Sequence, residues 1–121
     1  MKSVIIIAHG SRRSNSNEEF IAFVESIKNF SDDHQQSIKP AFLELGSPTL
    51  SQAIQVEIDN GATQIDILPY FLSAGVHVNL DIPKHISKAE NIFPGCTFTI
   101  LPYVGALPGM HNLVLSQISF K

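Results

Sequence analysis

The strongest constraint on the fold is a short apolar run close to the N-terminus. From Val4 to Ala8 every side chain is apolar, and most are β-branched. A run that is apolar on both alternating faces is typical of a strand covered by helices on both sides of a parallel sheet. The run ends at His9-Gly10, after too few residues for a signal-peptide core or a membrane span. We therefore expect a central strand at residues 3–8.

The rest of the chain alternates between strand-like and helical patterns. The expected strands after the first are residues 39–45, 64–68 and 97–101. The last of these alternates threonine with apolar residues, which favours the edge of a sheet. Helical spacing of apolar residues predicts helices at 17–30, 48–60, 82–93 and after residue 108.

Several residues mark the ends of these helices. Ser16 and Glu19 have the spacing of a capping box, and Ser47 before Pro48 is expected to cap the second helix. Gly61 stands where a helix C-terminal glycine belongs. The third helix is expected to begin at 81–83. The final helix is expected to turn its apolar residues inward, namely Met110, Leu113, Val114 and Ile118.

This element order defines the fold class. Strands alternating with helices predict parallel pairing through right-handed crossovers. We expect an α/β, three-layer, flavodoxin-like half: one domain over residues 1–121, with four mostly parallel strands and helices on both faces.

Composition narrows the classes of function. The formal net charge is −3 and no dense basic stripe is visible, which argues against nucleic-acid binding. Cys96 is the one cysteine, so no intrachain disulfide or thiolate cluster can form, and we interpret it as a small buried residue. A reducing, cytoplasmic compartment fits this composition.

Three side chains with metal-binding chemistry follow strands. In an open parallel sheet, ligands bind beyond the carboxyl ends of the strands. His9 follows the first strand, Glu44 closes the second, and His77 lies in the long loop after the third. Two imidazoles and a carboxylate suit Co²⁺, Fe²⁺, Ni²⁺ or Zn²⁺ and leave coordination positions open. The alternative is that these histidines are only structural. His34, His85 and His111 are expected to be structural or solvated.

Two loops beside these residues have binding character. Free backbone amides in the loop Gly10-Ser11-Arg12-Arg13, together with the guanidinium groups of its two arginines, are suited to an anion; the alternative is a solvated turn. The segment 69–77 mixes aromatic, aliphatic and flexible residues, which suits a pocket for a flat hydrophobic ligand or a core-packing loop. Gly75 is expected to permit the chain reversal that presents His77.

Taken together, these motifs resemble a known family. The order and spacing over nearly the whole chain are similar to the short sirohydrochlorin chelatases, the class II enzymes that insert cobalt or iron into a modified tetrapyrrole. The family's usual Pro-Leu-Phe-Leu is Pro-Tyr-Phe-Leu here, a departure at Tyr70 that concerns the shape of the pocket. The motifs are His9-Gly10-Ser11-Arg12, Phe42-Leu43-Glu44 with Pro48, and Pro69-Tyr70-Phe71-Leu72 with Gly75, His77 and Asp81-Ile82-Pro83.

The resemblance implies roles for particular residues. It implies that His9, Glu44 and His77 bind the metal and carry out the insertion, with the histidines also accepting pyrrole protons. The divalent metal, Co²⁺ or Fe²⁺ with Ni²⁺ as a further candidate, is then a substrate, and no cofactor is permanently bound. Sirohydrochlorin is the implied tetrapyrrole and a homodimer the implied assembly, without nucleic acid or membrane. The expected substrate-binding residues are Ser11, Arg12, Arg13, Phe71, Leu72 and Gly75.

Two other functions remain open at this point. One is a non-catalytic carrier of metal or tetrapyrrole on the same fold. The other is a flavodoxin-like interaction domain, which predicts that His9 and His77 do not converge. Flavin binding is disfavoured, because the loop after the first strand lacks a run of Ser, Thr and Gly to bind a phosphate.

Overall fold

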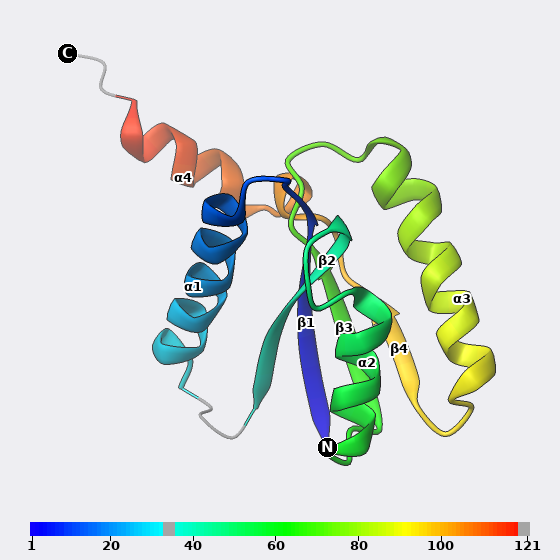
Figure 1. Cartoon of the computed structure of the whole chain (residues 1–121). Helices are drawn as coiled ribbons and strands as arrows, with labels where there is room; N and C mark the ends of the chain where they lie inside the picture. Colours follow the sequence, from blue (N-terminus) through cyan, green and yellow to red (C-terminus); the bar gives the residue numbers. More distant parts are fainter. Residues whose placement is uncertain (33–35, 119–121) are drawn as a thin grey trace.

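The structure is a computed structural model that describes residues 1–32 and 36–118 of the 121-residue chain. Strands and helices alternate along it, as the apolar periodicity predicts (Figure 1). The strands are β1 (Lys2–Gly10), β2 (Ser37–Leu45), β3 (Gln64–Pro69) and β4 (Thr97–Ile100). The helices are α1 (Ser14–Phe30), α2 (Leu50–Asp59), α3 (Ile82–Ile92) and α4 (Gly109–Gln117), with a π-helical turn at His77–Asp81 and a 3-10 turn at Val104–Ala106.

The four strands form one parallel sheet in the order β2-β1-β3-β4. Ile5 pairs with Lys39 on one side and with Ile67 on the other, so β1 is central, as its apolar run predicts. Among the described residues β4 pairs only with β3, which confirms its edge position. The topology therefore places the carboxyl ends of β1, β2 and β3 side by side.

Helices lie on both faces of the sheet, which confirms the three-layer α/β fold. Figure 1 shows α1 on one side of the sheet and α2 and α3 on the other. The main core lies between the sheet and these last two helices, and it includes Ile5, Ile67 and Ile82, each 0% exposed. Val24 is the fully buried residue of α1, whereas Phe23 and Phe30 of its apolar stripe are exposed.

Two of the expected helix caps are wrong. The helix α1 begins at Ser14, its N-cap position is Arg13, and no side chain caps it, so Ser16 and Glu19 do not form a capping box. In α2 the cap is Thr49 rather than Ser47: the Thr49 hydroxyl accepts from the Gln52 amide, and the Gln52 side chain accepts from the Thr49 amide. The peptide bond between Ser47 and Pro48 is cis, which turns the chain before the cap.

The expectation for α4 is also wrong. Leu113, Val114 and Ile118 are 60%, 49% and 45% exposed, and α4 has no fully buried residue. Figure 1 shows α4 extending away from the sheet beyond the end of α1. The apolar spacing of α4 identifies a face that needs covering, but the described part of this chain does not cover it.

Candidate metal site at the carboxyl ends of the strands

The three predicted ligands meet at one place. One ligand atom from each of His9, Glu44 and His77 lies within 4.8 Å of the other two. The two imidazole rings are 4.6 Å apart between centroids. The three side chains are 36%, 53% and 37% exposed, so an ion bound there remains open to solvent or substrate. This convergence contradicts the interaction-domain alternative, which predicts separate histidines.

The pairing of β1 and β2 is irregular beside His9 and Glu44. Ala8 pairs with Phe42 and Gly10 pairs with Leu45, so β2 has one residue more than β1 between these pairs. Such irregularities often lie next to functional sites. Gly10 has φ +97°, and a Cβ there would lie 2.4 Å from the carbonyl oxygen of Leu45. Only glycine fits this close approach of two backbones.

Hydrogen bonding determines which His9 nitrogen is free. Nδ1 lies 3.2 Å from the carbonyl oxygen of Gly10, which can only accept, so Nδ1 carries the proton. In the neutral ring, Nε2 then presents a lone pair 3.1 Å from Oε2 of Glu44. A proton shared between the two groups or a metal ion fits between these two atoms. Ligand atoms about 2.1 Å from one tetrahedral metal lie about 3.4 Å apart, which is close to this separation.

His77 is oriented by a carboxylate one helical turn away. Gly75, with φ +58°, reverses the chain before His77, as the sequence predicts. The π-helical turn then closes with the Ile82 amide donating to the carbonyl of His77. Nδ1 of His77 lies 2.8 Å from Oδ2 of Asp81, so Nδ1–H donates to the carboxylate and Nε2 is left for a metal. π-Helical turns are frequent at functional sites.

Sequence reasoning missed the role of Asp81, which it interpreted only as a helix start. The signal that would have found it is the spacing His-x-x-x-Asp from His77, because side chains four residues apart lie on one helical face. The ligand atoms of His9, Glu44 and His77 all lie within 4.8 Å of one another, so the three exposed side chains could hold one metal ion.

The loop after β1 is closed by Asn17. Its Oδ1 accepts from the Ser11 amide at 2.9 Å, and its Nδ2 donates to the carbonyls of Ser11 and Leu45. The Ser11 hydroxyl accepts from the Arg13 amide at 3.1 Å. The expectation of free amides is therefore wrong at Ser11 and Arg13. The side chains of Arg12 and Arg13 are exposed and form no ion pair among the described residues.

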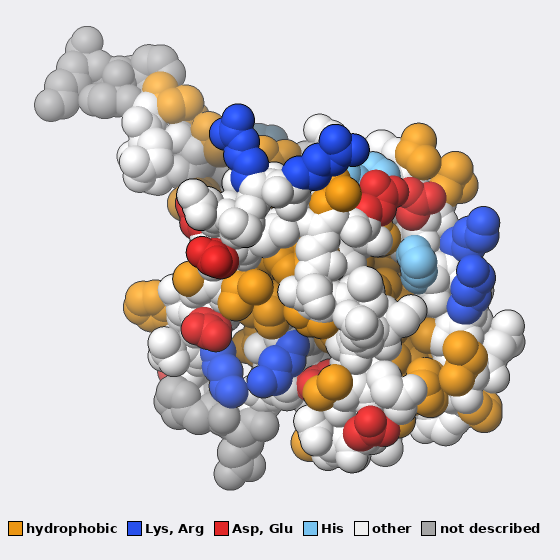
Figure 2. Space-filling model, viewed as in Figure 1, with side chains coloured by type: hydrophobic (Ala, Val, Ile, Leu, Met, Phe, Trp, Pro, Cys, Tyr) orange, Lys and Arg blue, Asp and Glu red, His pale blue; other side chains and the backbone are white. Residues whose placement is uncertain are grey.

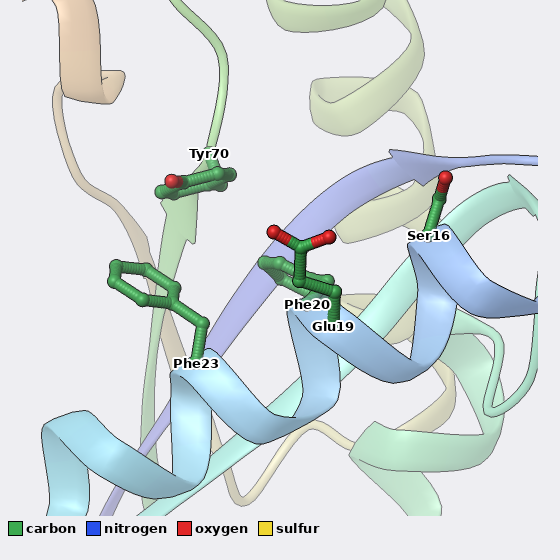
Figure 3. Close-up of a pocket in the computed structure, with 5 residues that line it drawn as sticks. All are labelled: Ser16, Glu19, Phe20, Phe23 and Tyr70. Atoms are coloured by element: carbon green, nitrogen blue, oxygen red, sulfur yellow. The ribbon is translucent and has the colours of Figure 1, made fainter.

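The aromatic residues that follow β3 pack in two different places. Phe71 packs against the main core and stacks on His77, with ring centroids 6.2 Å apart, while Leu72 is exposed. Tyr70 turns toward α1 instead (Figure 3). There it lines a hollow of about 250 Å³ with Phe20 and Phe23, whose ring centroids lie 5.4 and 5.3 Å from the Tyr70 ring. The departure at Tyr70 thus shapes an aromatic hollow beside α1.

Among the described residues, the other two histidines and the cysteine are not part of the cluster. His85 lies on α3 and His111 on α4, and His34 lies outside the described residues. Cys96 is half-buried and precedes β4, at the opposite end of the sheet. Burial raises the pKa of the Cys96 thiol, which favours its neutral form. No helix in the described ranges is long and apolar enough to cross a membrane.

A parallel α/β sheet with an open His-Glu-His cluster at its carboxyl edge belongs to the class of α/β proteins whose side chains could hold a transition-metal ion. The sequence model of the CbiX family matches residues 3–120, and the chain belongs to this family. It is 37% identical over 94 residues to the sirohydrochlorin ferrochelatase of Priestia megaterium, a match that covers 78% of this chain and 35% of that one.

Two solved structures are similar over nearly the whole chain. A putative cobalamin (vitamin B12) biosynthesis CbiX protein from Marinobacter aquaeolei VT8 has a TM-score of 0.81 and 26% identity, with 96% of this chain and 92% of that one covered. The sirohydrochlorin chelatase SirB from Bacillus subtilis subspecies spizizenii, in complex with cobalt, has a TM-score of 0.83 and 26% identity, with 95% and 48% covered. The chain spans about half the length of the curated relatives it matches, from 35% to 62% for the first four.

Proposed function

We propose that this chain is a sirohydrochlorin chelatase that inserts Co²⁺ or Fe²⁺ into the tetrapyrrole. The single observation that carries the proposal is the convergence of His9, Glu44 and His77 in an exposed cluster. Family membership supports it, because relatives are named sirohydrochlorin ferrochelatase and sirohydrochlorin cobaltochelatase. Both metals are substrates in this reaction.

Insertion places two demands on the protein. The ion must be held weakly enough to leave, and the two pyrrole N–H protons that it replaces must be accepted. In our proposal Nε2 of His9, Nε2 of His77 and the Glu44 carboxylate bind the ion, and its other positions stay open to the pyrrole nitrogens. As the ion leaves, the vacated imidazole and carboxylate accept the two protons, so charge and protons balance.

The residues around the cluster are proposed to hold the macrocycle. The exposed Leu72 and the ring of Phe71 provide an apolar surface beside His77, and Gly75 leaves room there because it has no side chain. Arg12 and Arg13 are proposed to pair with peripheral carboxylates of the substrate, and the Ser11 hydroxyl to donate to one of them.

We further propose that the protein acts as a homodimer. The helix α4 exposes Leu113, Val114 and Leu115 around much of its circumference, and a large amount of exposed apolar surface usually marks an interface. SirB is about twice as long as this chain, which covers 48% of it. A second copy would supply the missing half and cover α4.

A metal-insertion assay that follows the tetrapyrrole absorbance tests the proposed function. We expect His9→Ala and His77→Ala each to lose insertion while they keep the fold by circular dichroism, and Glu90→Ala, at an exposed position of α3, to retain insertion. Multiple turnovers distinguish an enzyme from a stoichiometric carrier. Full rates in both His9→Ala and His77→Ala would exclude this mechanism.

A further inference from the structure

A second hollow lies beside the metal cluster on the α3 side. It has a volume of about 240 Å³. Two of its residues connect it to the cluster: Glu44 is one of the three ligands, and Asp81 orients His77. We call it the α3 hollow, and it is lined by Leu43, Glu44, Asp81, Lys84, His85 and Lys88.

The helix α3 presents polar residues to this hollow along one stripe. Positions 81, 84 and 88 are spaced by three and four residues, so their side chains lie one above another on the same helical face. The opposite face carries Ile82 and Ile86, which are buried in the core. Core packing on one face thus holds the polar stripe of α3 toward the cluster.

The acidic side chains of the hollow have charged or hydrogen-bonding partners, whereas its lysines have no carboxylate partner in the described part of the chain. Oε2 of Glu44 lies 3.1 Å from His9, and Oδ2 of Asp81 lies 2.8 Å from His77, so both acids have partners. Across the described ranges, no carboxylate lies within 4.0 Å of the ammonium group of Lys84 or Lys88. Two unpaired positive charges therefore stand at the edge of a site that handles a cation, where they weaken metal binding unless an anion joins them.

Basic side chains flank the cluster on two sides. Figure 2 shows blue side chains on both sides of the acidic and histidine side chains that gather at the carboxyl end of the sheet. Arg12 and Arg13 follow β1, and Lys84 and Lys88 project from α3. A ligand that reaches both pairs has to be broad and to carry several anionic groups on its periphery.

We propose that the α3 hollow is a carboxylate-binding subsite in which Lys84 and Lys88 hold side-chain carboxylates of the tetrapyrrole. The inference rests on the proposed function for its substrate. The lysines bind the substrate at its rim and do not contact the metal, so they set the affinity for the tetrapyrrole. The ring is then held over the cluster by cations on two opposite sides.

The test compares two double variants with the same change in charge. Lys84→Gln/Lys88→Gln removes the subsite, and Lys28→Gln/Lys39→Gln removes two lysines of α1 and β2 at the other end of the sheet. The first measurement is fluorescence titration with metal-free uroporphyrin, a porphyrin with eight carboxylates. The second is KM and kcat for insertion of Co²⁺ into sirohydrochlorin.

We expect the Lys84→Gln/Lys88→Gln variant to bind uroporphyrin at least ten-fold more weakly and to raise KM by a similar factor. Its kcat should stay within two-fold of wild type, and its dependence on salt should be flatter because two screened charges are gone. Lys84→Arg/Lys88→Arg should stay within three-fold of wild type. The Lys28→Gln/Lys39→Gln control should be unchanged.

The proposed subsite would be overturned if Lys84→Gln/Lys88→Gln and Lys28→Gln/Lys39→Gln bound uroporphyrin with equal affinity. It would also be overturned if wild type bound uroporphyrin and its uncharged octamethyl ester equally well. Absence of uroporphyrin binding by wild type would also overturn it. Failure of the proposed function is a separate result: wild type binds uroporphyrin and the subsite variant does not, yet wild type makes no metal–tetrapyrrole product.

Discussion

His9 and His77 are each held through Nδ1, and this leaves Nε2 of each ring for a ligand. The partner of His9 is a backbone carbonyl, whereas the partner of His77 is the carboxylate of Asp81. A carboxylate makes the ring a better ligand and fixes its orientation. The two imidazoles therefore differ in how firmly the fold holds them, and Asp81 is the residue through which His77 is most easily perturbed.

Removal of the Asp81 carboxylate should weaken metal binding without removing a ligand. We expect Asp81→Ala to lower the affinity for Co²⁺ by about 10–100-fold, the usual effect of losing such a partner. Titration of Co²⁺ by its visible absorption measures this. Glu90→Ala, an exposed acid on the same helix, is the control. Equal affinities in the two variants would show that Asp81 does not orient His77.

The close approach of Gly10 to Leu45 predicts a graded effect of alanine at three glycines. Gly10 combines positive φ with a clash, Gly61 has positive φ in open space, and Gly95 has neither feature. We expect Gly61→Ala to cost about 1 kcal/mol of stability, Gly10→Ala to cost more than that, and Gly95→Ala to cost nearly nothing. Urea unfolding measures the series. If Gly10→Ala were no worse than Gly61→Ala, the close approach to Leu45 would be wrong.

At the scale of elements, periodicity predicted the order of strands and helices, and parallel topology then predicted where the site lies. With β1 central and β2 and β3 beside it, the carboxyl ends of these strands lie together, so His9, Glu44 and His77 could be grouped from sequence. The caps could not be predicted, because Ser47 and Thr49 are both good capping residues and only the observed contact of Thr49 with the Gln52 amide distinguishes them. The roles of Asn17 in closing the loop after β1 and of Asp81 in orienting His77 depend on side-chain contacts, which apolar periodicity does not predict.

The observed cap of α2 makes a direct prediction. Thr49→Ala removes the side-chain partner of the Gln52 amide and should lower the free energy of unfolding by about 1 kcal/mol. Ser47→Ala should change it by less than about 0.5 kcal/mol, since exposed side chains without such a role contribute little. Thermal or urea unfolding of both variants checks the pair, and the reverse order of costs would contradict the assignment.

At the scale of the whole molecule, α4 is the element whose surroundings sequence reasoning misjudged. An apolar stripe shows that a face needs covering, but it does not show which chain covers it. In the described structure the stripe is exposed. Two of the relatives are also about twice as long as this chain. The proposed second copy accounts for both the exposed apolar residues of α4 and this difference in length.

The proposed dimer depends on this exposed face. We expect wild type to sediment with twice the chain mass, and Leu113→Glu/Leu115→Glu to sediment as a monomer with unchanged far-ultraviolet circular dichroism. The control is Phe30→Glu, which places a charge on an apolar residue of α1 that is even more exposed. A monomeric wild type at micromolar concentration, or a double variant that remains dimeric, would contradict the proposal.

Anomalous diffraction at the cobalt edge, from crystals soaked in Co²⁺, shows whether His9, Glu44 and His77 share one ion. We expect one strong peak per chain, about 2.1 Å from Nε2 of His9 and Nε2 of His77 and within bonding distance of the Glu44 carboxylate. A peak elsewhere on the molecule, or well-ordered His9 and His77 with no cobalt between them, would contradict it.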